Sequence, residues 1–256
     1  MFLATGVSCK DRSSALYEDA INKIQGQNFT AAVLLLEQAS QLQKIKNLKY
    51  KYLTDAARII RFELQDYTKA INILRQIILE SEDESQRILA QESLTEIYLE
   101  NLQDYEKALK ELQILEPLLK DSMKKEKTRL RIAQTLFLTG HNKQALEEIV
   151  VAEKNIKFNE ALFLKLKAEI LTADKNYKEA ITTYQTLYSK NQTYFADENL
   201  HIAISMVYEE NEQYTDALNY LVKNESSVKD KSYYELRVKR LKSKIANKPL
   251  SHGVKK

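Results

Sequence analysis

Two stretches of the chain carry nearly the same order of apolar and polar residues, LQDYTKAINIL at 64–74 and LQDYEKALKEL at 102–112. In the first copy, Ala70 is followed four and seven residues later by Leu74 and Ile77. Positions i, i+4 and i+7 lie on one face of a helix, and the second copy repeats the arrangement. The pattern therefore predicts an amphipathic helix that begins near each tyrosine.

The motif recurs along the chain in six units. Its alanine is found at Ala32, Ala70, Ala108, Ala145, Ala180 and Ala217, with spacings of 38, 38, 37, 35 and 37 residues. Three residues before the alanine, five of the units have an aromatic residue: Phe29, Tyr67, Tyr105, Tyr177 and Tyr214. The fourth unit has Asn142 at this place. We expect the alanines and the aromatic residues to be the positions through which the units pack on one another.

A second amphipathic stretch precedes each motif, so that each unit is predicted to be a pair of helices. In this stretch a small residue comes one turn before a large one, as with Ala57 and Ile60. The joints are predicted to be tight turns, with Asp66, Asp104 and Asn176 placed to cap the second helix. One such hairpin cannot bury its own apolar face, so neighbouring hairpins must stack. We attribute the length of the repeat to extended helices and to loops such as residues 81–85.

Composition supports an all-helical chain. Among 256 residues only four are Gly and two are Pro, while 44% are hydrophobic. The residues that interrupt helices are thus rare, and the apolar content is sufficient for a packed core. Residues 231–246, KSYYELRVKRLKSKIA, place Tyr234, Val238, Leu241 and Ile245 on one face. This segment is predicted to be a terminal helix that covers the last hairpin, followed by a disordered basic tail at 247–256.

The small residue, the aromatic residue, the following alanine and the period near 34 residues resemble the tetratricopeptide repeat. This resemblance implies an α-solenoid, a right-handed superhelix of antiparallel helix pairs. Six hairpins would cover residues 12–225 and a capping helix residues 226–246, after a flexible N-terminus or signal remnant at 1–11. It also implies that the first helices line a concave groove that holds another protein or a peptide.

Carrying the family's groove positions onto each unit yields seven candidate partner-binding residues. These are Arg58, Arg61, Glu92, Glu96, Gln134, Lys165 and Glu169. Their mixed signs favour a partner that is recognised by several charge pairs. The set of Lys and Asn residues with which some relatives clamp a C-terminal carboxylate is not recognisable in this chain.

Charge and residue chemistry argue against other classes of function. The net charge is +3, and nine Lys or Arg follow from position 231 onward against Glu235 alone, so residues 1–230 carry a net charge of −5. An acidic body disfavours nucleic acid as a partner. The single cysteine excludes a disulfide framework, and the three histidines lack metal-ligand spacing. We expect no catalytic residues, no cofactor and no metal.

The segment MFLATGVSCK bears on the location of the protein. An apolar run that ends in small residues before Cys9 resembles the end of a bacterial lipoprotein signal, although it is short and carries no positive charge. Two hypotheses stay open. In the first, Cys9 is lipidated and the protein is an envelope lipoprotein that helps assemble an outer-membrane or pilus-type machine, similar to type IV pilus pilotins. In the second, the protein is a cytoplasmic adaptor for a regulatory protein, for example in motility or polarity control.

Overall fold

A computed structural model of the chain describes residues 11–154 and 156–247. These residues form fourteen α-helices and no strand. The chain divides into two compact units, Met1–Thr128 and Arg129–Lys256, and the division falls inside helix α7 (Ser122–Leu138). Each unit is described by itself.

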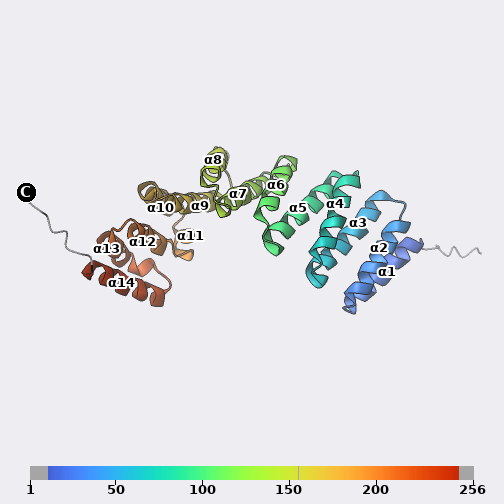
Figure 1. Ribbon diagram of the computed structural model, residues 1–256, viewed down its shortest axis with the longest axis horizontal. Helices are drawn as coiled ribbons and strands as arrows, with labels where there is room; N and C mark the ends of the chain where they lie inside the picture. Colours follow the sequence, from blue (N-terminus) through green and yellow to red (C-terminus); the bar gives the residue numbers. More distant parts are fainter. Residues whose placement is uncertain (1–10, 155, 248–256) are drawn as a thin grey trace, which may run out of the picture. The chain divides into compact units, whose positions relative to one another are not determined.

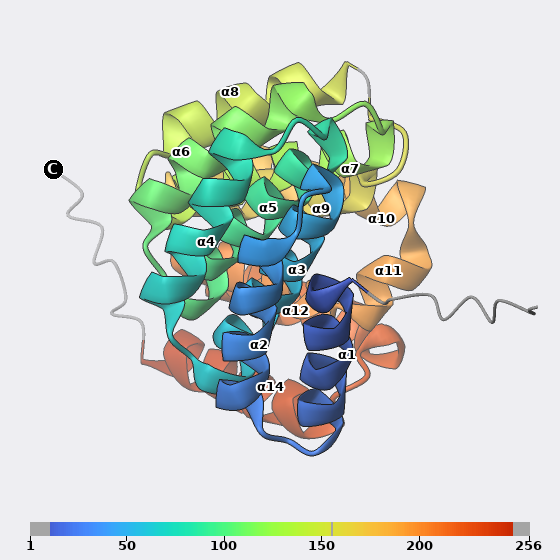
Figure 2. The ribbon, with the colours of Figure 1, turned by 90° about the vertical axis from the view of Figure 1, so that its right-hand side faces the viewer.

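The first unit consists of successive helix pairs (Figure 1). Its helices are α1 (Arg12–Gln25), α2 (Phe29–Leu42), α3 (Lys46–Ile59), α4 (Tyr67–Glu80), α5 (Glu84–Glu96), α6 (Tyr105–Leu115) and the start of α7, with the π-helical turns η1 (Ile60–Leu64) and η2 (Ile97–Asn101) and the 3-10 turn η3 (Glu116–Leu118). We call α1, α3 and α5 first helices and α2, α4 and α6 second helices. Seen along the chain of hairpins, α2 and α4 lie on one side of the unit and α1 and α3 on the other (Figure 2).

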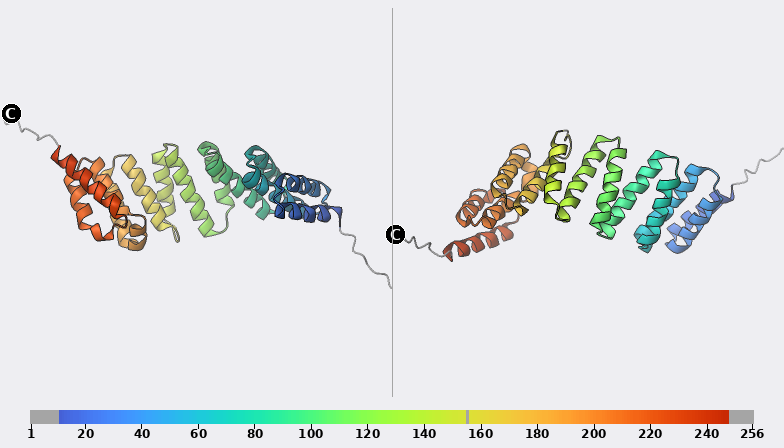
Figure 3. Two further views of the ribbon diagram at one scale, coloured as in Figure 1. Left: turned by 90° about the horizontal axis from the view of Figure 1, so that it is seen from below. Right: turned by 45° about the horizontal axis from the view of Figure 1, so that its top comes forward.

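The second unit continues the same alternation with one additional helix. It contains the end of α7, then α8 (Asn142–Glu153), α9 (Glu160–Ala173), α10 (Tyr177–Lys190), the short α11 (Gln192–Asp197), α12 (Leu200–Glu210), α13 (Tyr214–Lys223), the 3-10 turn η4 (Glu225–Ser227) and α14 (Lys231–Ala246). First helices are α7, α9 and α12, and second helices are α8, α10 and α13. The C-terminal helices α12, α13 and α14, coloured orange to red, lie side by side (Figure 3).

The repeated alanines lie at the centres of the helix contacts. Ala32, Ala70, Ala108, Ala145, Ala180 and Ala217 are each 0% exposed. A methyl side chain lets two helix backbones approach closely, and a larger one would force them apart. The aromatic residues that precede these alanines are half-buried, and Phe29, Tyr67, Tyr177 and Tyr214 pack against the edges of the core.

Every hairpin turns through a residue in the left-handed region, two positions before its second helix. These residues are Gln27, Gln65, Gln103, Gly140, Lys175 and Glu212, with φ between 51° and 78°. The left-handed conformation lets the backbone N–H of the next residue return to a carbonyl of the first helix. Only the fourth hairpin has glycine at the left-handed position, so the other five place a side chain where it costs about 1 kcal/mol.

The two LQDY hairpins differ from the other four in this turn. In them the N–H of Asp66 donates to the carbonyl of Ile60 at 3.1 Å, and that of Asp104 to Tyr98 at 2.9 Å, each six residues back. The equivalent bond spans five residues elsewhere, as from Gln213 to Tyr208 at 2.9 Å. The π-helical turns η1 and η2 thus accommodate one additional residue. They explain part of the length of the repeat, which the sequence attributes to extended helices and to loops.

Capping is as predicted at two of the three proposed sites. The Asp66 carboxylate accepts from the N–H of Lys69 at 3.0 Å, and the Asp104 carboxylate from Lys107 at 3.1 Å. The prediction for Asn176 is wrong, because its side chain makes no capping bond and its Nδ2 donates instead to Glu179 at 2.6 Å. The terminal helix predicted over 231–246 is confirmed as α14, with Tyr234 and Leu241 buried.

Candidate partner-binding faces

The first helices of the first unit hold an ordered group of polar and aromatic side chains. The ring of Tyr17 on α1 stacks on that of Tyr52 on α3, with centroids 4.4 Å apart. Its hydroxyl donates to Oδ2 of Asp55 at 3.0 Å. Burial and this carboxylate raise the pKa of Tyr17 to about 12, although the nearby charge of Arg58 opposes the shift. Tyr17 therefore stays protonated, and its position is set before any partner arrives.

The two arginines predicted to line the groove lie in different environments. Arg58 is exposed on α3, beside the group formed by Tyr17, Tyr52 and Asp55. Arg61 is 5% exposed, which does not fit the role that the sequence suggested for it. Its guanidinium donates to Asn101 at 2.8 Å and to Glu96 at 2.7 Å, and it lies 3.4 Å from Glu100. Three contacts to the next hairpin thus hold Arg61 inside the unit.

The two predicted acidic residues of α5 are also bound within the unit. Glu96 is the partner of Arg61, and Glu92 accepts from Lys124 at 2.9 Å. Both are partly exposed, with side chains 37% and 26% accessible. A partner that used these carboxylates would have to share them with, or take them from, the cations that already hold them.

In the second unit, the predicted residues lie on α7 and α9. Gln134 is exposed on α7, whereas Lys165 donates to Glu198 at 2.6 Å. Glu169 is half-buried one turn after Lys165. Burial raises the pKa of Glu169 and the charge of Glu198 adds to this, although Lys165 opposes both effects. Of the seven predicted residues, four are therefore engaged in ion pairs within their own unit.

These contacts share a spacing that the sequence contains. Tyr17 and Asp55 are 38 residues apart, and Arg61 and Glu96 are 35 apart. Further ion pairs join residues about one repeat apart in the same way: Lys46–Glu82, Lys120–Glu84, Lys124–Glu92, Lys165–Glu198 and Lys190–Glu160. Opposite charges separated by one repeat are therefore the signal that could have distinguished paired residues from those left to bind a partner.

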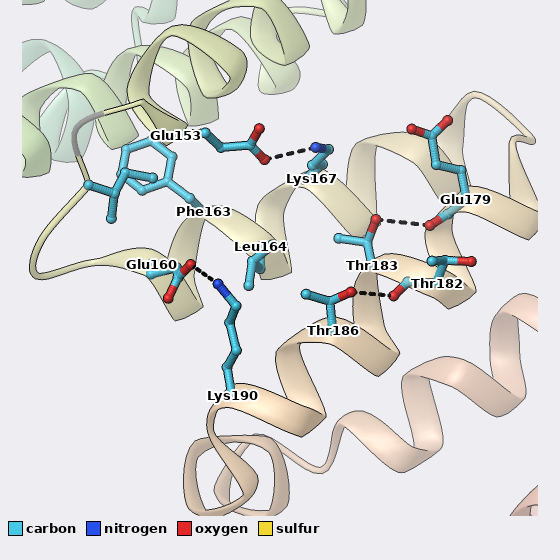
Figure 4. A pocket seen from close by; sticks show the side chains of 11 residues that line it. Glu153, Glu160, Phe163, Leu164, Lys167, Glu179, Thr182, Thr183, Thr186 and Lys190 are labelled. Carbon is cyan, nitrogen blue, oxygen red and sulfur yellow. Dashed lines mark hydrogen bonds and ion pairs between the residues drawn. The ribbon is translucent and has the colours of Figure 1, made fainter.

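Two cavities lie between second helices. The first, of about 420 Å³ in the second unit, has Phe163 and Leu164 of α9 between α8 and α10 (Figure 4). Lys167 pairs with Glu153 at 2.8 Å and Lys190 pairs with Glu160 at its edge. The other, of about 680 Å³ in the first unit, lies in the equivalent place between α2 and α4. None of the seven predicted groove residues lines either cavity.

A cluster of charges joins α12 to α14 near the end of the described chain. Glu209 is 7% exposed and its carboxylate lies 2.5 Å from Arg237, 2.9 Å from Arg240 and 3.1 Å from Lys244. Burial by itself raises the pKa of Glu209, but the bond from Lys244 and the charges of the two arginines hold it below its usual value. The sequence did not predict this cluster, although Glu209 and Arg240 are again about one repeat apart.

Other kinds of site are not found in the part of the chain that the structure describes. Within residues 11–154 and 156–247, no three His, Cys, Asp or Glu side chains converge as a metal site would require. None of the helices in the same ranges has the length and apolar character needed to cross a membrane. The predicted lipidation residue, Cys9, lies outside the described residues.

Comparison with known proteins identifies the fold. No family model matches the sequence, and neither does any curated protein. A tetratricopeptide repeat protein from Parabacteroides merdae ATCC 43184 is similar in structure, with 17% identity, 92% of this chain and 94% of that chain covered, and a TM-score of 0.58. A signal transduction ATPase with numerous domains and a tetratricopeptide repeat sensor, from Pyrococcus horikoshii, is 18% identical over 92% of this chain and 39% of that one, with a TM-score of 0.59.

A third similar structure is the apo form of RapI, 12% identical over 91% of this chain and 75% of that chain, with a TM-score of 0.56. The chain is therefore a helical-repeat protein. Its fold is that of the tetratricopeptide repeat proteins, which confirms the fold predicted from the repeated motif.

Proposed function

We propose that the protein is a non-enzymatic scaffold that binds a partner protein or peptide on the first helices of its first unit. The observation that carries the proposal is the ordered group of Tyr17, Tyr52 and Asp55, beside which Arg58 is exposed. Side chains that are already held in place lose little conformational entropy when a partner binds, so they contribute more to affinity. The two cavities are less suited, because ion pairs between their own residues occupy part of each lining.

Arg58 is the residue that we expect to contact the partner most directly. An exposed guanidinium beside aromatic rings and a carboxylate can bind an acidic side chain bidentately, and arginine is enriched among residues that dominate binding energy. Arg61 is not a suitable probe, because replacing it would disturb the contact between two hairpins. The test therefore changes Arg58 alone.

The experiment begins with a photo-reactive amino acid in place of Arg58, and in a second variant in place of Lys110. Lys110 is exposed on the second helix α6 of the same unit and serves as the matched control. A partner that is cross-linked from position 58 but not from position 110 would be purified and titrated. Arg58→Glu should then weaken its binding at least about tenfold, or about 1.4 kcal/mol, and Lys110→Glu should leave it unchanged. Equal cross-linking from both positions would contradict the proposal.

We further propose that the scaffold is a bacterial envelope lipoprotein, anchored through Cys9, that aids assembly of an outer-membrane or pilus-type machine. Support comes from the sequence alone, in which small residues precede Cys9 after an apolar run and a polar segment follows. The gene with its upstream DNA would be expressed with labelled palmitate. Label that is incorporated by the natural protein and lost in Cys9→Ser is the expected result. A natural protein without label would favour the cytoplasmic adaptor instead.

A further inference from the structure

The C-terminal helix α14 has one side packed and another exposed. Tyr234, Val238 and Leu241 pack with α13 and with residues of α12. On another side, Leu236 is 61% exposed and Tyr233 is 39% exposed. In the six hairpins a second helix follows the first, but no second helix follows α14 in the residues that the structure describes. The exposed side is thus a helix face that none of the described elements covers.

The helix that carries this face is strongly positive. Six cationic residues lie on α14 against Glu235 alone, a net charge of +5. Three of these cations, Arg237, Arg240 and Lys244, surround the single buried carboxylate of Glu209. Three positive charges against one negative charge leave this cluster with a net charge of +2. Arg237 is 5% exposed, and its Nε and Nη2 make no hydrogen bond in the described chain, although Nη2 lies 2.5 Å from Glu209 as an ion pair. The surplus of positive charge around Glu209 favours the approach of negative charge.

Charge selects among the candidates that could cover the face. A second copy of α14 would bring another net charge of +5 against it, and residues 248–256 contain three lysines and no acid. Both would be repelled. A membrane-binding helix needs a broad apolar face, whereas most of the apolar side chains of α14 are already packed against α13. An apolar side chain surrounded by arginine and lysine is suited to an acidic amphipathic helix.

We propose that the face formed by Tyr233, Leu236 and Arg240 binds an acidic amphipathic segment of a partner protein. At 100° per residue these three side chains lie within about 60° of one another around α14. Leu236 and the ring of Tyr233 supply the apolar contact. Arg240 bonds Glu209 through its Nε, and its side chain is 59% exposed, so its two terminal nitrogens pair with a carboxylate of the partner. This site is distinct from the first helices of the first unit, so it gives the protein a second partner-binding surface.

The test uses the full chain and a labelled helical peptide of about twenty residues, with leucine at every third or fourth position and glutamate at the flanking ones. A second peptide has lysine in place of each glutamate. Fluorescence anisotropy should show binding of the acidic peptide and none of the basic peptide. Leu236→Ala and Arg240→Ala should each weaken binding about tenfold, which corresponds to about 1.4 kcal/mol.

The matched control is Lys242→Ala. Lys242 is an exposed cation on the same helix but about 180° from Tyr233, so its loss should change affinity less than about twofold. Arg58→Glu should also leave peptide binding intact, which separates this site from the proposed function. Since Leu236 is 61% exposed, its variant should keep the natural unfolding temperature, and any loss of binding then reports on the face itself.

Four results would overturn the proposal. The first is failure of the acidic peptide to bind, or equal binding of both peptides. The second is equal weakening by Lys242→Ala and Arg240→Ala, which would indicate unspecific attraction to charge. The third is binding to phosphatidylglycerol vesicles that Leu236→Ala abolishes, which would identify a lipid surface. The last is a dimer in sedimentation that Leu236→Ala dissociates, which would identify a second copy of the chain.

Discussion

Arg61 in the first unit and Glu209 in the second occupy the same place in their hairpins and carry opposite charges. In each hairpin turn, the backbone N–H of the residue before the second helix donates to a carbonyl of the first helix, that of Ile60 in the first case and that of Tyr208 in the second. Arg61 and Glu209 each come directly after this acceptor residue. Both are nearly buried, at 5% and 7% exposure. In each unit the helix that follows the hairpin supplies opposite charges: glutamates of α5 and its turn η2 around Arg61, and two arginines and a lysine of α14 around Glu209.

The comparison shows that this place in the hairpin accepts a buried charge of either sign, provided that the helix after the hairpin neutralises it. The two clusters differ in what surrounds the central charge. The partners of Arg61 are Glu96 and Glu100, whose side chains are 37% and 55% exposed. The nearest partner of Glu209 is Arg237, which is only 5% exposed. Removing the central charge therefore has different consequences in the two units.

The largest expected effect comes from removing these central charges. Glu209→Ala should lower the free energy of unfolding by about 3–5 kcal/mol, because Arg237 would stay buried without its counter-ion. Arg61→Ala should cost about 2 kcal/mol, since Glu96 and Glu100 can return to water. Urea unfolding of both variants measures the difference, with Glu235→Ala on the exposed side of α14 as a control that stays within about 0.5 kcal/mol. Equal losses for both variants would show that burial of the remaining partner is not decisive.

A smaller effect on stability is expected from replacing the two glycines of the hairpin turns, Gly26 in the first unit and Gly140 in the second. Gly140 has a φ of 78°, so Gly140→Ala should destabilise by about 1 kcal/mol through the backbone alone, because nothing lies within 4 Å of the added methyl group. Gly26 has a φ of −82°, and its added methyl group would meet the carbonyl of Asn22 at an ordinary 3.5 Å. Gly26→Ala should therefore stabilise by about 0.5 kcal/mol. Thermal unfolding temperatures that move in the same direction would refute this account of the turns.

The smallest effect is a pH dependence confined to the second unit. His201 is 2% exposed among the rings of Tyr188, Phe195 and Tyr220, with Nδ1 3.0 Å from the Tyr220 hydroxyl. Burial lowers the pKa of His201. The unfolded chain therefore takes up a proton more readily than the folded one, and stability is lost as the pH falls below about 6.5.

The first unit contains no histidine, so it serves as the internal reference. Between pH 7 and pH 5, amide hydrogen exchange corrected for intrinsic rates should accelerate in α12 and α13 and stay constant in α3 and α4. His201→Phe should remove the acceleration while keeping an aromatic ring in the site. Acceleration of the same size in both units would mean that another group is responsible.

Much of the fold could be predicted because each hairpin is specified locally. The alanine, the aromatic residue and the apolar side chains four and seven positions later define a helix face by periodicity alone, and the alanine and the side chain four positions later are buried in all six units. The turn residue was less visible. Five of the six left-handed residues are Gln, Lys or Glu, which have no particular preference for that conformation, so the sequence shows no glycine signal there except at Gly140.

The candidate site was harder to predict, because exposure and pairing depend on neighbours about one repeat away. Arg58 and Arg61 look equivalent in the sequence, three residues apart on the same first helix. The π-helical turn η1 and the carboxylates of the next hairpin bury Arg61 and leave Arg58 exposed. The cavities between second helices could not be located for the same reason, since three separate helices line each of them.

The sequence by itself determined that the chain is helical, that the residues described by the structure contain six hairpins and a final helix, though not the short α11, and which residues pack them. The helices and their packing faces follow from spacings within about ten residues, and the number of units follows from the recurrence of the motif every 35–38 residues. Only the tertiary structure decided which charges are paired, which are left to bind a partner, and that a buried glutamate holds α14 in place. Those outcomes depend on distances between side chains on successive hairpins, where a single additional residue in a turn changes which side chains meet.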